Sequence, residues 1–66
     1  MNIVIKQCET CFSYAEVYID GELVMSGDEY HNKISSKIEG FLEGLNYTKT
    51  KYTLKKETIK CKFYCD

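Results

Sequence analysis

The residues best suited to chemistry are four cysteines, which form two close pairs near opposite ends of the chain. The first pair is Cys8-x2-Cys11 and the second is Cys61-x3-Cys65. Zinc binds four thiolates at the corners of a tetrahedron, and two thiolates on one turn supply two of those corners. If the strands that carry the two pairs are neighbours, all four sulfurs converge. We therefore expect a structural zinc ion (Zn2+) held by these four side chains, which would clip the two ends of the chain together.

The first pair has the spacing of a zinc knuckle without its usual glycine, and three other states remain open: two disulfides, unligated thiols and a redox pair. The segment after Met1 is not a charged stretch followed by a long apolar run, so we expect no secretory signal and a cytoplasmic protein. Thiols stay reduced there, which favours a metal over disulfides. A redox CxxC requires a helix N-terminus to lower the thiol pKa, and a strand pattern follows Cys11. Cys61 continues the apolar face of Ile59 and Phe63, so a plain core thiol is also compatible with the pattern.

The other polar residues form no catalytic set. His31 is the only histidine, and it has no Ser, Asp or Cys at the spacing of a known triad. The acidic residues are scattered, so no two carboxylates have the context for general acid–base catalysis. The four glycines form no phosphate-binding loop. A chain of 66 residues is also too short for a deep substrate cleft, so we do not expect an enzyme.

The first 25 residues have the pattern of three short strands. Residues 3–5 are apolar and β-branched, and residues 12–20 alternate between apolar and polar positions, as in a half-buried strand. The pair Asp20-Gly21 predicts a two-residue type I′ turn. Residues 22–25 then return as a third strand.

An amphipathic helix follows these strands. Ser26 and Glu29 have the spacing of a capping box, in which each side chain bonds the backbone amide of the other residue. Met25 and Tyr30 have the spacing of a hydrophobic staple. An apolar stripe then follows the period of a helix, at Tyr30, Ile34, Ile38, Phe41, Leu42 and Leu45. Gly40 costs helix stability, and we attribute its presence to a close approach of the helix to the sheet.

Residues 47–64 alternate again and are rich in Thr, Tyr and Lys. They fit either one long strand or a hairpin that turns near residues 55–57. The order is then β-β-β-α-β or β-β-β-α-β-β, which predicts an α+β fold: a small antiparallel sheet with one helix packed on one face and the ends joined by the four-cysteine site. We expect residues 1–66 to form a single domain.

Charge is unevenly distributed along the chain. Residues 1–46 hold three lysines and eight acidic residues, whereas residues 47–66 hold six lysines and two acidic residues. Lysines interleaved with aromatic residues, as around Lys60 and Lys62, are typical of a face that binds nucleic acid. The pI near 5.8 and the absence of arginine argue against this function, and lysines also protect an edge strand from aggregation. We therefore favour a solvated face and keep nucleic-acid binding by Lys60 and Lys62 as the alternative.

Tyr14 and Tyr18 are expected on the strand face opposite the core, and aromatic side chains exposed in this way are enriched in recognition surfaces. We therefore expect a small non-enzymatic, zinc-stapled module that binds another protein through Tyr14 and Tyr18, as a regulator or inhibitor. Abundant Lys, Ile, Tyr and Asn without Arg indicate an AT-rich coding sequence, as in a low-GC bacterium or its phage. Since no apolar run is long enough to span a bilayer, we expect no membrane partner.

Overall fold

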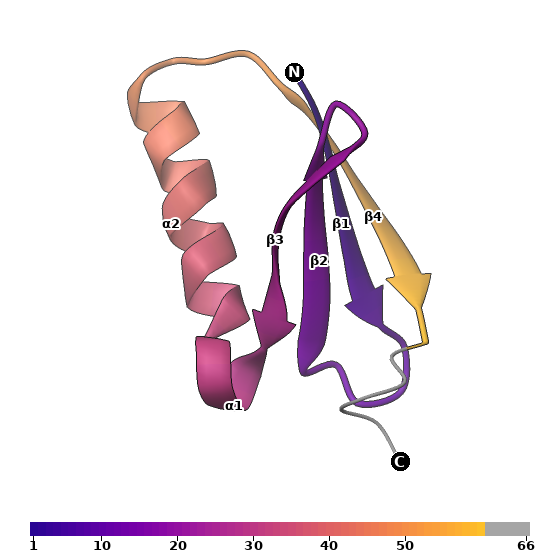
Figure 1. Ribbon diagram of the computed structural model, residues 1–66. Helices are drawn as coiled ribbons and strands as arrows, with labels where there is room; N and C mark the ends of the chain where they lie inside the picture. Colours follow the sequence, from indigo (N-terminus) through magenta and orange to yellow (C-terminus); the bar gives the residue numbers. More distant parts are fainter. Residues whose placement is uncertain (61–66) are drawn as a thin grey trace.

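The computed structural model describes residues 1–60 of the chain. Within these residues, four strands form one sheet, and two helices lie on one face of that sheet (Figure 1). In chain order the elements are β1 (Asn2–Cys8), β2 (Tyr14–Ile19), β3 (Glu22–Asp28), α1 (Glu29–Asn32), α2 (Ile34–Tyr47) and β4 (Thr53–Ile59). This arrangement confirms the expected α+β class. Within residues 1–60, β4 runs straight through residues 55–57, so the alternative of a hairpin turning there is wrong.

The sheet is mixed, with the strand order β3-β2-β1-β4. β2 pairs antiparallel with β1 and with β3, whereas β4 pairs parallel with β1. Our expectation of a purely antiparallel sheet is therefore wrong. The reason is the helix: β3 runs in the same direction as β1, and α2 carries the chain back to the end at which β3 began. The next strand therefore repeats that direction beside β1.

The hairpin between β2 and β3 turns at Asp20 and Gly21, as the sequence predicts. Their φ angles are 51° and 86°, and a type I′ turn requires positive values at both positions. The backbone amide of Asn2 donates to the Asp20 carboxylate at 2.9 Å, which ties the turn to the start of β1. A register shift next to Val17 leaves Val24 in β3 without a partner on β2, and Val24 is 49% exposed.

The helical segment begins later than the sequence suggests. β3 continues through Ser26 to Asp28, whose carboxylate caps α1 by accepting the backbone amide of His31 at 2.8 Å. The capping box predicted at Ser26 and Glu29 is therefore wrong, because Ser26 is held in the sheet by its pairing with β2. Tyr30 is 84% exposed, so it belongs neither to a hydrophobic staple nor to the buried stripe.

The rest of the apolar stripe packs on the sheet as predicted. The helical conformation is interrupted between α1 and α2 at Lys33, whose φ is 49°. Ile34, the first residue of α2, is 2% exposed. The centre of the core is a buried cluster of β1 and β2 side chains. Partly buried apolar residues pack around this cluster: Ile19, Met25, Ile38, Phe41, Leu42, Leu45 and Tyr52.

Gly40 does not mark a close contact between α2 and the sheet. A Cβ atom added at Gly40 would meet nothing within 4 Å, and the same holds at Gly44. Both glycines are exposed. Our explanation of Gly40 by helix–sheet packing is therefore wrong, because the space around it is open.

Both helices are short. α1 has four residues and α2 has 14. Within residues 1–60, neither helix combines the length and the apolar character that crossing a bilayer requires.

Candidate functional site

The first cysteine pair lies where β1 ends. Cys8 is the last residue of β1 and is fully buried, and Cys11 in the following turn is half-buried. The Ser13 hydroxyl donates a hydrogen bond to the Cys11 sulfur at 3.2 Å. Hydrogen bonds to a ligand orient it and tune its charge in metal sites. These are suitable surroundings for a thiolate ligand.

β4 runs alongside this cysteine pair. Cys8 and Ile59 are register partners in the parallel pairing, and the Glu9 amide donates to the Ile59 carbonyl at 2.8 Å. β1 and β4 therefore end side by side (Figure 1), so the strands that precede the two cysteine pairs are neighbours. Cys61 and Cys65 lie outside the described residues. In the described part of the chain, no three His, Cys, Asp or Glu side chains are grouped so that they could hold a metal ion.

The sheet face opposite α2 carries Lys6, Tyr14, Glu16 and Tyr18, and we name it the open face. The Tyr14 hydroxyl donates to one carboxylate oxygen of Glu16 at 2.6 Å, and the Tyr18 hydroxyl donates to the other at 2.8 Å. The Lys6 ammonium lies 4.7 Å from the centroid of the Tyr18 ring. Both tyrosines are half-buried. Each ring is therefore held at its backbone and at its hydroxyl, and the two rings flank one carboxylate.

Tyr18 is not suited to proton transfer. The hydrogen bond to Glu16 raises the pKa of Tyr18 above the usual 10.0, and burial and the nearby carboxylate charge act in the same direction. Tyr18 therefore stays a neutral hydrogen-bond donor at physiological pH. The face offers ordered aromatic surface and fixed hydrogen bonds rather than an activated base.

Two lysines in and directly after β4, Lys55 and Lys60, lie close to carboxylates. The Lys60 side chain is 83% exposed, and its ammonium lies 3.9 Å from a carboxylate oxygen of Glu9. Lys55 pairs in the same way with Glu57 at 3.3 Å. Lys62, the other residue of the predicted nucleic-acid site, lies outside the described residues. Two of the lysines available for phosphate contacts are thus already close to negative charge.

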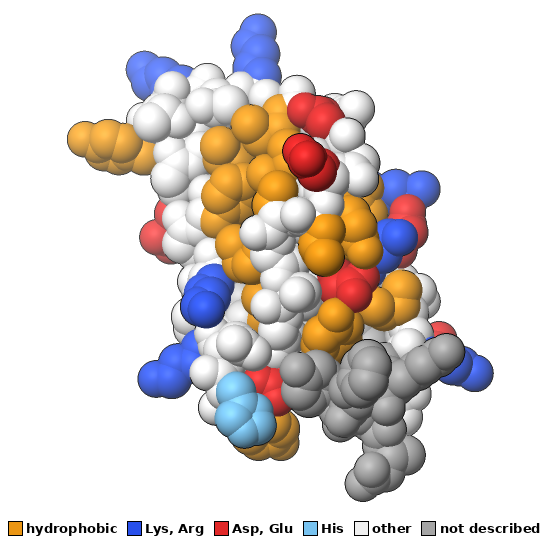
Figure 2. Space-filling view, in the orientation of Figure 1, with side chains coloured by type: hydrophobic (Ala, Val, Ile, Leu, Met, Phe, Trp, Pro, Cys, Tyr) orange, Lys and Arg blue, Asp and Glu red, His pale blue; other side chains and the backbone are white. Residues whose placement is uncertain are grey.

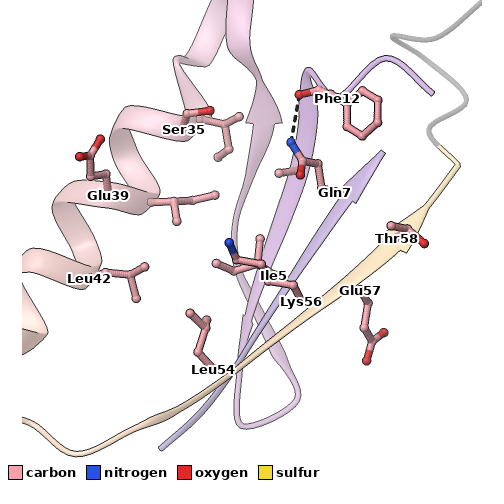
Figure 3. A pocket seen from close by; sticks show the side chains of 13 residues that line it. Ile5, Gln7, Phe12, Ser35, Glu39, Leu42, Leu54, Lys56, Glu57 and Thr58 are labelled. Carbon is pink, nitrogen blue, oxygen red and sulfur yellow. Dashed lines mark hydrogen bonds between the residues drawn. The ribbon is translucent and has the colours of Figure 1, made fainter. Parts of the chain in front are cut away.

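A groove lies on the other side of the sheet, between α2 and β4 (Figure 3). It has a volume of about 370 Å³. Ile5 and Ala15 form its floor, Ile38 and Leu42 line it from α2, and Leu54 lines it from β4. Figure 2 shows apolar side chains gathered in a band beside the helix. The sequence analysis missed this groove, although its signal was present: one predicted helix is too narrow to cover a sheet of four strands.

His31 is solvent-facing, and its side chain is 81% exposed. Its Nδ1 atom lies 2.8 Å from a carboxylate oxygen of Asp28, and the Asp28 backbone amide donates to the Asn32 side chain at 3.0 Å. The side-chain hydrogen bond from His31 is the main reason that the pKa of Asp28 is lowered. This pair therefore belongs to the cap of α1.

Comparisons of this chain with family models, with curated proteins and with solved structures find no match. Function must then be argued from the geometry of the sites. Three features carry that argument: the cysteine pair at the end of β1, the open face and the groove.

Proposed function

We propose that this chain is a non-enzymatic, zinc-stapled module that binds another protein through the open face, as a regulator or inhibitor in the reducing cytoplasm. The observation that carries the binding function is the pair of hydrogen bonds that Tyr14 and Tyr18 donate to Glu16. Side chains that are already ordered lose little conformational entropy when a partner binds. Tyrosine is also among the residues that contribute most to protein interfaces.

The surroundings of Tyr18 support this function. Its register partners are Val4 on β1 and Leu23 on β3, so an apolar strip crosses three neighbouring strands. Leu23 is 51% exposed. Lys6 and Glu16 place charge beside this strip. An apolar centre with a polar rim is the usual composition of a protein–protein interface.

The zinc staple is supported by the parallel ends of β1 and β4. Cys61 follows Ile59 by two residues and Cys65 follows it by six. Extended chain of these lengths reaches about 7 Å and about 21 Å, which is enough for both thiolates to meet Cys8 and Cys11. A zinc ion at this point would hold the edge strand β4 to β1, and small domains commonly need such a staple because their cores are small.

Native mass spectrometry of protein purified with a reductant tests the staple. We expect one zinc ion per chain, and we expect a chelator to remove it and lower the melting temperature. Cys11→Ser should lose the ion, whereas Ser36→Ala, a substitution at an exposed position of α2, should keep it. A zinc-free chain with unchanged stability contradicts the staple, and a mass reduced by two hydrogens per bond would assign disulfides instead.

Affinity capture with variant baits tests the open face. Tyr14→Ala/Tyr18→Ala should lose a protein that the wild-type chain retains. Tyr30→Ala/Tyr47→Ala removes two tyrosines that are 84% and 90% exposed away from this face, so it should retain that protein. Circular dichroism of all baits checks that they fold. If every protein retained by the wild type is also retained by the Tyr14→Ala/Tyr18→Ala bait, the proposed surface is wrong.

A further inference from the structure

One helix is too narrow to cover the whole sheet, and the groove lies beside it, between α2 and β4. Neighbouring strands lie about 4.8 Å apart, so four strands span about 14 Å between the outer two. A helix is only about 10 Å wide. α2 packs against β2 and β3, and Leu54 on β4 remains 42% exposed. The floor residues Ile5 and Ala15 are themselves buried, so the apolar surface of the groove that faces solvent in a single copy of the described chain is that of its β4 wall at Leu54.

Phe12 closes one end of the groove at a conformational cost. The side chain is 64% exposed, and its φ of 57° lies in the left-handed region that bulky residues rarely adopt. The side-chain amide of Gln7 donates to the Phe12 carbonyl at 3.1 Å and holds the turn in this conformation (Figure 3). An exposed aromatic ring on a strained turn beside an apolar groove indicates a surface that is covered in the functional state.

The two walls of the groove carry opposite charges. Glu39 lines it from α2 and Lys56 lines it from β4, and both are exposed. Within residues 1–60, the ion pairs involve other residues: His31 with Asp28, Lys55 with Glu57 and Lys60 with Glu9. A twofold axis along the groove brings the α2 wall of one copy against the β4 wall of a second copy. This rotation places Glu39 of each copy opposite Lys56 of the other copy, so the same charge contact is made at two places.

We propose that the groove is the interface of a homodimer, in which a second copy of this chain covers the groove with its exposed Leu54 wall and Glu39 of each copy faces Lys56 of the other. The net charge of -1 opposes self-association only weakly. The dimer would also add burial to a chain with a small buried core, made of Ile3, Ile5, Cys8, Ala15, Val17 and Ile34. Because the groove and the open face lie on opposite sides of the sheet, this inference is independent of the proposed partner protein.

Sedimentation velocity of the full chain, with zinc and a reductant in the buffer, tests the dimer. Over a range from about 1 μM to about 1 mM, we expect a reversible monomer–dimer equilibrium that added salt weakens. Glu39→Lys and Lys56→Glu each place like charges against one another, so each should raise the dissociation constant about tenfold. The double variant Glu39→Lys/Lys56→Glu reverses both charges and should restore the wild-type equilibrium.

Lys55→Glu is the matched control, because it makes the same charge change on the same strand but on the opposite face. It should leave the equilibrium unchanged. A chain that is monomeric over the whole range overturns the proposal, as does a double variant that fails to restore association. If the monomer instead binds a synthetic amphipathic helix that shifts the groove resonances in NMR spectra, the groove belongs to a different partner and the dimer is wrong.

Discussion

Asp28 shows how a single residue decides where the helical segment begins. Its carboxylate is 2% exposed and accepts hydrogen bonds from the backbone and the ring of His31, while its own amide donates to Asn32. Ser26 carries a hydroxyl that is equally suited to a cap, but it lies inside β3. The pairing of β3 with β2 continues as far as Tyr14 opposite Asp28. The choice between the two caps is therefore made by the sheet and not by the local sequence.

Acid should destabilise the fold through Asp28. Its pKa is lowered from 3.8 in the folded chain, mainly by the hydrogen bond from His31. The ionised carboxylate therefore contributes its full stabilisation at pH values above the pKa of Asp28 in the unfolded chain. This stabilisation is lost as the pH falls through the lowered pKa of the folded chain. In chemical denaturation, Asp28→Asn should be less stable at neutral pH and should lose less stability on acidification. Glu43→Gln, which removes an exposed carboxylate of α2, should retain the wild-type pH dependence, and an equally steep Asp28→Asn curve would contradict this role.

At the scale of elements, α2 has an inner face that packs on the sheet and an outer face whose glycines lower the stability of the helix. Ile34, at its start, is buried, and the partly buried residues of the stripe pack against the central cluster. Gly40 and Gly44 lie in open space. Glycine weakens a helix because the unfolded chain gains conformational freedom that folding must remove. Nothing within the described chain requires the small size of either glycine.

Replacing these glycines should therefore stabilise the protein. Gly40→Ala and Gly44→Ala should each raise the free energy of unfolding by about 1 kcal/mol, measured by urea denaturation at 25 °C. Gly27→Ala is the contrasting case, because its new Cβ would lie 2.5 Å from the Asn32 side chain, which accepts the Asp28 amide. It should destabilise the fold. A loss of stability in Gly40→Ala would show that the outer face of α2 is covered in solution.

At the scale of the whole molecule, the predictable features are those that depend on neighbours in sequence. The turn at Asp20 and Gly21 follows from two adjacent residues, and the stripe of α2 follows from a helical period. The parallel direction of β4 depends on where α2 returns the chain, which no residue of β4 encodes. The groove depends on the width of the sheet relative to one helix. Glu16 could have been recognised as the partner of Tyr14 and Tyr18, because residues two apart share a strand face.

The distribution of charge over the whole molecule argues against nucleic-acid binding. Lys55 and Lys56 are adjacent in β4 and therefore point to opposite faces of the sheet. Lys55 already pairs with Glu57, and the ammonium of Lys60 lies 3.9 Å from Glu9. Among the described lysines of this region, Lys55 and Lys56 thus do not share one surface, and Lys55 and Lys60 are already close to a carboxylate. Counterion release from a shared basic surface is the main source of nonspecific affinity for a phosphate backbone.

Labelled single- and double-stranded oligonucleotides should therefore show no binding in titrations at about 50 mM salt, where phosphate contacts are strong. Fluorescence anisotropy measures this directly. The wild type and Lys60→Glu/Lys62→Glu should give the same flat response, because the described lysines of this region are divided between two faces or lie close to carboxylates. Micromolar binding by the wild type that disappears in the double variant and falls steeply with added salt would contradict this expectation. That result would make the basic end of the chain, rather than the open face, the binding surface of the protein.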